Sequence, residues 1–414
     1  MEANTSSQHI NIPEMTTSES HVPTDMMITN RSNGTTPCWN EYCWDEPTYF
    51  DHLYEHITPE DFEWGFIVPY FLTFIVGLVG NALVCFAVWR NHNMRTVTNV
   101  FIVNLAVGDF MVILVCLPPT LIQDVIETWF LGTACCKVVL YLQTTAVCVS
   151  VLTLSAIAVE RWWAICYPLR FKSTLPRARK IIVLIWVVAF LTALPEAVVA
   201  KAIPYNFPNR ISTKLLTMCK PSWDPLNQGI YQIILALIFY VLPMILMALT
   251  YSHIACVLWK RDIPGAIVNI KTPGRKPMLD SNRNSQEDQI VSRRKAARML
   301  IAIVIVFGVC YLPVHLMNLL RYFEVVSYGG SRRELFIQSM IIHLLPYINS
   351  SLNPVIYNFM SAKFRKEFKT ACLCCFYGIR KRPYQPRRET TFTMTFSNSN
   401  YSNCHTEEVT LASI

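Results

Sequence analysis

The sequence has few charged residues for its length, and basic residues are almost absent from its first part. Of the 414 residues, 15% are charged and 52% are hydrophobic, a balance typical of membrane proteins. Before Trp64 there are 12 acidic residues and one basic residue, Arg31. The net charge of +8 therefore describes a polarised membrane protein and does not indicate a nucleic-acid-binding protein.

The first 60 residues also lack an apolar core long enough for a secretory signal peptide, so we expect the first membrane span to serve as the targeting signal. Residues 1–63 are rich in Ser, Thr, Asn and acidic residues and predict a glycosylated extracellular arm. Its sequons begin at Asn4, Asn30 and Asn33, and their chance occurrence in such a segment is the alternative. Cys38 and Cys43 can close a small loop or remain free.

A short segment before the first span is amphipathic. Tyr49, Phe50, Leu53, Tyr54 and Ile57 repeat at roughly helical spacing. We expect this segment either to lie on the bilayer or to clasp a ligand.

Long apolar runs then recur along the chain, each near the roughly 20 residues that a helix needs to cross the hydrocarbon. They cover residues 66–89, 100–122, 136–158, 181–203, 230–258, 299–320 and 335–360. The fold class predicted is therefore an all-α membrane protein, a bundle of seven transmembrane helices within residues 64–361. An odd number of spans places the two termini on opposite sides.

Basic residues set the orientation. The segments after the first, third and fifth runs are rich in Lys and Arg, as is the tail from Lys363. The positive-inside rule makes these segments cytoplasmic and the acidic arm extracellular, so we expect a plasma-membrane protein with a cytoplasmic C-terminus.

The cytoplasmic parts divide into three. Residues 260–292 contain Pro, Gly and polar residues and predict a flexible loop. Residues 362–376 predict a short amphipathic eighth helix that carries palmitoylation candidates at Cys372, Cys374 and Cys375, with unmodified thiols as the alternative. Residues 377–414 predict a disordered tail with many Thr and Ser, suited to phosphorylation.

Polar residues inside the runs need partners, because the bilayer core has no water. Asn81, Asp109, Ser150, Asn349 and Asn353 fall at similar depth in their runs. Asp109, Ser150, Asn349 and Asn353 can form an oxygen cage for Na⁺. A neutral Asp109 in a structural hydrogen-bond cluster is the alternative, and no cofactor is otherwise required.

A second polar set lies toward the extracellular ends of six runs and predicts one cavity open to the outside. Its members are Gln123, Asp124, Gln143, Glu196, Tyr231, Gln232, His315, Asn318, His343 and Tyr347. Each can instead be a satisfied core residue. Cys136 and Cys219 are both expected on the extracellular side, where thiols oxidise, and Cys135 competes for that bond.

Two other classes of protein fit less well. A seven-helix transporter or channel would explain Asp109, but it predicts internal repeats and a continuous charged path, and neither is visible. An enzyme would need a metal motif or a nucleophile with its base, and the runs contain neither.

The ordered motifs resemble those of the rhodopsin-like (class A) G protein-coupled receptors over residues 64–376. They are Gly80-Asn81, Asn104 to Asp109, Cys136 with Cys219, Glu160-Arg161-Trp162, Trp186, Pro243 with Tyr251, Phe307 to Pro313, and Asn353-Pro354-Val355-Ile356-Tyr357. The departures narrow the group. Trp162 after the arginine and Tyr311 before Leu-Pro look like the orexin and allatotropin neuropeptide receptors, and Glu160 is similar to the invertebrate allatotropin receptors.

The resemblance implies an extracellular peptide pocket. It is lined by Asp124, Gln143, Glu196, Tyr231, Gln232, Asn318, His343 and Tyr347. Retinal binding would need a lysine where the family position is Tyr347, and monoamine binding an aspartate where Gln143 stands. An amide at Gln143 suits the C-terminal amide of a peptide.

The resemblance also implies a switch. The residues that operate it are Glu160, Arg161, Trp162, Tyr251, Phe307, Tyr311, Pro313, Asn353, Pro354 and Tyr357. Glu160 should hold Arg161 at rest and release it when the helix predicted over residues 299–320 swings at Pro313. The expected partners are an amidated neuropeptide, a heterotrimeric G protein of the Gq type with calcium release, arrestin and receptor kinases at the tail, and membrane lipid.

Overall fold

The structure is a computed structural model that describes residues 46–59, 61–170, 173–205, 214–260, 280–322 and 332–377. The three sequons, the Cys38 and Cys43 pair, most of the predicted loop of residues 260–292 and the tail from residue 378 lie outside these residues.

Six helical stretches in the described residues are long and apolar enough to cross a membrane. They are α2 (Asp61–Arg90), α3 with α4 (Val97–Met111 and Leu117–Ile126), α5 (Gly132–Cys166), α6 (Leu175–Val199), α7 with α8 (Pro225–Ala236 and Leu242–Lys260) and α9 (Asp280–Tyr322). A single 3₁₀ turn, η1 (His92–Met94), links α2 to α3.

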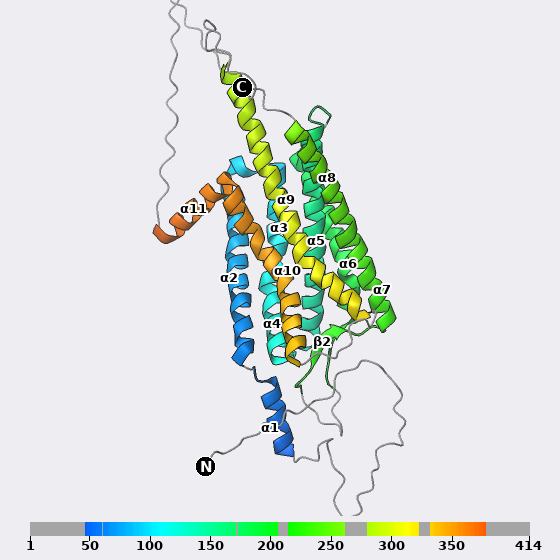
Figure 1. Cartoon of the computed structure of the whole chain (residues 1–414). Helices are drawn as coiled ribbons and strands as arrows, with labels where there is room; N and C mark the ends of the chain where they lie inside the picture. The colour runs from blue at the N-terminus through cyan, green and yellow to red at the C-terminus, as the bar shows by residue number, and fades with distance from the viewer. Residues whose placement is uncertain are drawn as a thin grey trace, which may run out of the picture. The chain divides into compact units, whose positions relative to one another are not determined.

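Helix α10 (Arg332–Met360) is less apolar than these six and completes the bundle. It packs against α2 and α9 along its length, so the ring of helices closes (Figure 1). Its polar residues explain its composition, since Asn349, Ser350 and Asn353 are buried inside the bundle rather than turned to the surrounding lipid. The described helices form the predicted bundle of seven spans, and α11 (Ala362–Tyr377) follows it.

Two spans contain a π-helical turn next to a proline. The turn η2 (Val112–Cys116) precedes Pro118, and η4 (Leu237–Val241) precedes Pro243. Proline has no backbone N–H to donate, and a wider turn accommodates the lost hydrogen bond and bends the rod.

Two predicted boundaries were wrong. The fourth run was expected to stay helical to residue 203, but α6 ends at Val199 and residues 200–203 form strand β1 (Ala200–Ile203). The loop was expected to extend to residue 292, but α9 already begins at Asp280. The residues from Asp280 to Arg298 contain no Gly or Pro and many helix formers, so the helix continues beyond the apolar run.

One end of the bundle carries a hairpin and a disulfide, and we call it the disulfide end. Strand β1 pairs antiparallel with β2 (Met218–Pro221), with Ala202 opposite Cys219. A disulfide joins Cys219 to Cys136 in the first turns of α5, and Cys135 remains free. The opposite end, which carries Arg161, is called the arginine end.

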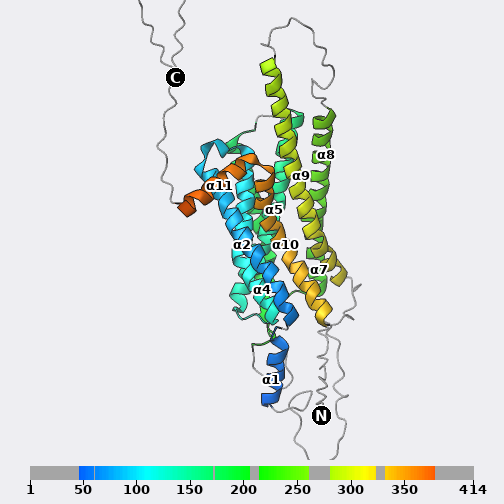
Figure 2. The same cartoon turned by 60° about the vertical axis from the view of Figure 1, so that its left-hand side comes forward.

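Helix α1 (Glu46–Ile57) also lies at the disulfide end (Figure 2). Its apolar face, formed by Tyr49, Leu53 and Ile57, is buried against Leu215 and Leu216 of the segment that leads into β2. The apolar face of the amphipathic segment is therefore covered by protein.

Candidate functional site

At the arginine end, Glu160 and Arg161 form an ion pair that is held by several hydrogen bonds. Arg161 donates from Nε to Glu160 Oε2 at 2.5 Å and from its terminal nitrogen to Oε1 at 2.7 Å. Ser173 Oγ donates to Oε1 at 2.7 Å and Thr98 Oγ1 to Oε2 at 3.4 Å. Charge-assisted bonds of this kind are stronger than neutral ones. Glu160 is 7% exposed and has donors on both oxygens.

A cavity of about 180 Å³ opens beside this pair. Its polar lining residues are Arg161, Tyr251 and Arg293. Its apolar lining residues are Ala164, Ile165, Ile254, Ala296, Ala297 and Leu300. Arg161 therefore contacts Glu160 and also lines the cavity, where its side chain has space to move if the ion pair breaks.

The residue after the arginine is also tied down. The Trp162 indole donates to Nδ1 of His253 on α8 at 2.8 Å. Its ring meets Trp163 edge-on, with 5.0 Å between centroids. A tryptophan here thus joins α5 to α8 through a directed hydrogen bond.

The middle of the bundle contains a buried amide and carboxylate cluster. Asn81 donates to the backbone oxygens of Gly77 at 2.9 Å and Ser350 at 3.1 Å, which links α2 to α10. Asn353 Nδ2 donates to Asp109 Oδ2 at 2.8 Å, which links α10 to α3. All of these side chains are within the protein interior, where polar groups need partners.

Several oxygens of this cluster have no hydrogen-bond partner among the described residues. They are Asn81 Oδ1, Asp109 Oδ1, Asn349 Oδ1, Asn353 Oδ1 and the Tyr357 hydroxyl. The Ser150 hydroxyl lies within interaction range of the Asp109 carboxylate. Residues predicted as an oxygen cage thus share one buried region and leave oxygen atoms unused.

Pro354 fixes the spacing of two helices beside this cluster. A Cβ added to Gly80 of α2 would lie 2.8 Å from the Pro354 ring of α10. Only a residue without a side chain permits this approach.

Aromatic rings of α9 and η4 contact one another inside the bundle. Phe307 and Tyr311 on α9 have centroids 4.6 Å apart, and Tyr240 lies 6.2 Å from Phe307 and 4.9 Å from His315. Pro313 follows within the same helix. The two predicted switch aromatics therefore form one stack across α9 and η4.

At the disulfide end, three of the predicted pocket residues come together. His343 Nδ1 lies 2.9 Å from both oxygens of Asp124. The Tyr347 hydroxyl is 3.0 Å from Thr120 Oγ1, and Tyr70 donates to Asp124 at 3.4 Å and to the Met340 backbone oxygen at 2.9 Å. These contacts join α4 to α10 and α2.

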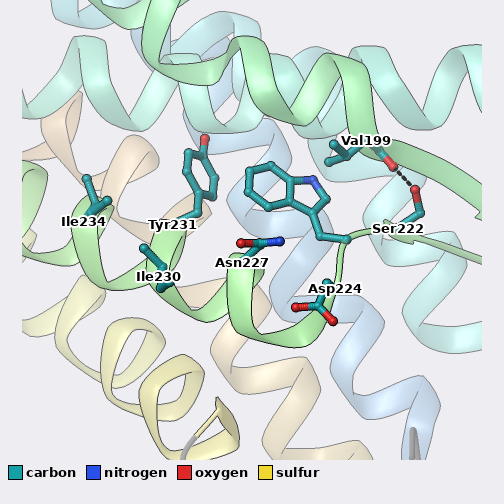
Figure 3. A pocket seen from close by; sticks show the side chains of 8 residues that line it. Val199, Ser222, Asp224, Asn227, Ile230, Tyr231 and Ile234 are labelled. Carbon is teal, nitrogen blue, oxygen red and sulfur yellow. Dashed lines mark hydrogen bonds between the residues drawn. The ribbon is translucent and has the colours of Figure 1, made fainter. Parts of the chain in front are cut away.

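Glu196 and Tyr231 lie on the other side of this end, on α6 and α7. Glu196 is 6% exposed, and its Oε2 has no hydrogen-bond partner in the described chain. Tyr231 donates to the Thr192 backbone oxygen at 3.0 Å and contacts the Trp223 ring, 5.1 Å between centroids. Tyr231 also lines a separate groove on α7 (Figure 3).

The remaining predicted pocket residues, Gln143, Gln232 and Asn318, are half-buried on α5, α7 and α9. Gln123 was expected in the same cavity. Its side chain accepts from the Cys219 backbone N–H at 2.9 Å and so links α4 to strand β2.

The sequence did not point to four of the partners. Tyr70, Thr120, Ser173 and His253 complete the networks described above, yet none stands out by charge or motif.

Comparisons with known proteins agree with this architecture. The model of the "7 transmembrane receptor (rhodopsin family)" matches residues 80–357. The chain is 32% identical over 311 residues to a "QRFP-like peptide receptor" of Branchiostoma floridae, and the match covers 74% of this chain and 77% of that protein. The matched family is one of receptors and not of enzymes. The chain therefore belongs to the rhodopsin family of seven-transmembrane receptors.

Proposed function

We propose that this chain is a cell-surface neuropeptide receptor that binds its ligand at the disulfide end and activates a heterotrimeric G protein at the arginine end. The observation that carries the proposal is the Glu160–Arg161 pair beside a cavity lined by Tyr251. Charged residues at the end of a long apolar helix are costly unless they are paired or hydrated, so they are functional candidates.

The disulfide end faces the outside of the cell. A disulfide between Cys136 and Cys219 supports this orientation, since such bonds persist in oxidising compartments. Basic residues in the segments at the opposite end support it as well. The arm of residues 1–63 is then extracellular, and the helix of residues 362–376 and the tail of 377–414 are cytoplasmic.

The ligand is an amidated peptide. Gln143 offers an amide that can pair with a peptide C-terminal amide, and the buried polar cluster of Asp124, His343 and Tyr347 offers further partners. The Branchiostoma floridae relative is named as a peptide receptor, which favours the same ligand class. Among peptides we place allatotropins first and orexins second, on the strength of Glu160 and Trp162.

The switch works by differential affinity. A ligand moves an equilibrium only if it binds one state more tightly, so the peptide must favour an arrangement that differs from the resting one. Contact at Gln143 and His343 shifts the Phe307 and Tyr311 stack, α9 swings at Pro313, and Arg161 leaves Glu160. The freed Arg161 then turns toward Tyr251 and the G protein, which we propose to be of the Gq type.

Sodium fits the buried cluster as an inhibitory ion. Carboxylate, amide and hydroxyl oxygens suit a hard cation, and Asp109, Ser150, Asn349 and Asn353 would hold it. The unused oxygens of Asp109, Asn349 and Asn353 are the structural support. Within the described residues, no group of three or more His, Cys, Asp or Glu side chains could hold another metal. A bound Na⁺ would supply positive charge to the buried Asp109 carboxylate.

The cytoplasmic side carries the remaining proposals. Cys372 on α11 is exposed and free, as a palmitoylation site requires. The side chains of Cys374 and Cys375, the tail serines and threonines that would recruit receptor kinases and arrestin, and Asn4, Asn30 and Asn33 lie outside the described side chains.

The test is a calcium-release assay in cells that express the full chain, with panels of amidated allatotropins, orexins and QRFP-like peptides. We expect a response to at least one peptide and a rightward shift in Gln143→Ala. Cys256→Ala, an exposed residue of α8, is the control and should leave the response unchanged. Silence toward every peptide despite surface expression would contradict the assignment.

A further inference from the structure

A groove on the outer face of α7 is separate from the polar cluster of the bundle interior. Its volume is about 540 Å³, and it is lined by Val199, Ser222, Trp223, Asp224, Asn227, Ile230, Tyr231 and Ile234. Figure 3 shows that Asn227, Ile230, Tyr231 and Ile234 project from one helix, while Val199 comes from the end of α6. We call this feature the α7 groove.

The part of the α7 groove lined by Ile230 and Ile234 is apolar and exposed on the outside of the bundle. Ile230 and Ile234 are four residues apart and 48% and 46% exposed. Leu226, Leu237 and Ile238 around them are also exposed. In a membrane-spanning helix such side chains meet hydrocarbon, so the groove opens toward the acyl region of the bilayer.

The mouth of the α7 groove is polar. Asp224, Asn227 and Ser222 are exposed around the residue where α7 begins. The rise from Asp224 to Ile234 is about 15 Å, half of a bilayer core. A groove with a polar mouth at headgroup depth and an apolar floor one leaflet deep fits an amphiphile, whereas a water-soluble peptide would lose its hydration there.

The chemistry of the mouth favours a zwitterionic headgroup with a quaternary ammonium. The groove lining includes the Asp224 carboxylate and the Trp223 and Tyr231 rings, and it contains no Lys or Arg. A groove whose lining includes a carboxylate and aromatic rings, and no basic side chain, favours an ammonium cation over an anion. Lys137 donates to the backbone oxygen of Val198 at 3.0 Å, and Val198 precedes the groove residue Val199. The positive charge of Lys137 would favour the phosphate of such a headgroup.

We propose that the α7 groove binds one phosphatidylcholine molecule, with choline at Asp224 and Trp223 and an acyl chain along Ile230 and Ile234. The groove shares only Tyr231 with the residues predicted for the peptide pocket, and Asp124, Gln143 and His343 do not line it. Bound lipid would brace α6 against α7 through Val199 and Tyr231.

The experiment uses the purified full chain, delipidated in detergent and without peptide. The receptor is incubated with equimolar phosphatidylcholine, phosphatidylglycerol and cholesterol, and native mass spectrometry counts the lipids retained. We expect one retained phosphatidylcholine. Ile234→Trp should reduce this retention about tenfold, because the larger side chain occupies the space of the acyl chain. A tenfold loss of affinity corresponds to about 1.4 kcal/mol, which is within the usual cost of overpacking.

Matched variants separate the site from general lipid contact. Ile245→Trp changes an isoleucine of α8 that is 51% exposed and lies outside the groove, so it should retain lipid as the parent does. Asp224→Asn should lower the preference for phosphatidylcholine over phosphatidylglycerol about threefold, the size of an exposed ion pair. Ile230→Trp is the second floor variant if Ile234→Trp fails to unfold cooperatively.

Equal retention by the floor variants and Ile245→Trp would overturn the proposal, as would retention of phosphatidylglycerol or cholesterol in place of phosphatidylcholine. Because no peptide or G protein is present, either result leaves the proposed receptor function unaffected.

Discussion

The two ends of the bundle each bury a glutamate to the same extent and surround it differently. Glu160 at the arginine end is 7% exposed, and Glu196 at the disulfide end is 6% exposed. Glu160 receives hydrogen bonds from Arg161, Ser173 and Thr98. Glu196 has an oxygen with no partner among the described residues.

The hydrogen bonding of the two glutamates indicates two roles: Glu160 stabilises the resting state, which we call the lock, and Glu196 is available to a ligand. A buried carboxylate with donors on both oxygens stabilises the arrangement that supplies them, and removing a donor leaves a costly unpaired group. A buried carboxylate with an unused oxygen is stabilised when a ligand supplies a hydrogen-bond donor. Burial alone would not have distinguished the two roles.

The largest effect should come from the disulfide, which among the described residues lies at the disulfide end. We expect Cys136→Ser or Cys219→Ser to lower the free energy of unfolding by about 2–5 kcal/mol and to reduce surface expression strongly. Cys135→Ser should do neither, since Cys135 is free. Surface staining and thermal unfolding provide the measurements, and equal loss in all three variants would contradict the pairing.

Glu160→Gln should release the lock. The amide keeps the shape but loses the charge-assisted bonds to Arg161, worth about 1.5 kcal/mol, so ligand-free signalling should rise about tenfold. Basal calcium or inositol phosphate at matched surface expression measures this. The control is Glu367→Gln at the same end, where Glu367 accepts from Asn91 at 3.0 Å and does not touch Arg161. Unchanged basal signalling in Glu160→Gln would count against the lock.

Glu196→Gln should behave in the opposite way. It removes a buried charge whose Oε2 is unpartnered, so we expect the free energy of unfolding to stay the same or rise by about 1 kcal/mol. Peptide potency should fall while basal signalling is unchanged. Thermal unfolding of the purified receptor gives the comparison with Glu160→Gln, and a loss of stability equal to that of Glu160→Gln would remove the distinction between the two ends.

The smallest effect concerns the hydrogen bond from Trp162 to His253. Trp162→Phe and His253→Ala should each lower the free energy of unfolding by about 0.5–1 kcal/mol. Because the two side chains form one bond, the double variant should cost less than the sum of the single ones. Strict additivity would show that Trp162 contributes through its ring contacts alone.

Much of the fold was predictable because it depends on chain length and apolar content. Seven runs of sufficient length indicated seven spans, and the structure has the corresponding helices. The start of α9 at Asp280 and the strand after Val199 were missed, because apolar content ends where the membrane ends and does not report where a helix or strand does.

The pairing of side chains was less predictable. The proximity of Asp109 and Asn353 followed from their equal depth, but the contacts of His343 with Asp124 and of Trp162 with His253 depend on how each helix is rotated about its axis. In a single sequence, the position of a residue within its apolar run indicates its depth in the membrane. The rotation of the helix about its axis is indicated only weakly, since lipid-facing and buried residues are both apolar.

The central claim is that occupancy of the disulfide end and release of Arg161 at the arginine end are one equilibrium. The direct test is the affinity of the activating peptide for the purified receptor, measured with and without saturating G protein. Linkage requires that a G protein whose affinity the peptide raises must raise peptide affinity by the same factor, expected at about 5- to 150-fold. Equal peptide affinity in the two conditions would contradict the account.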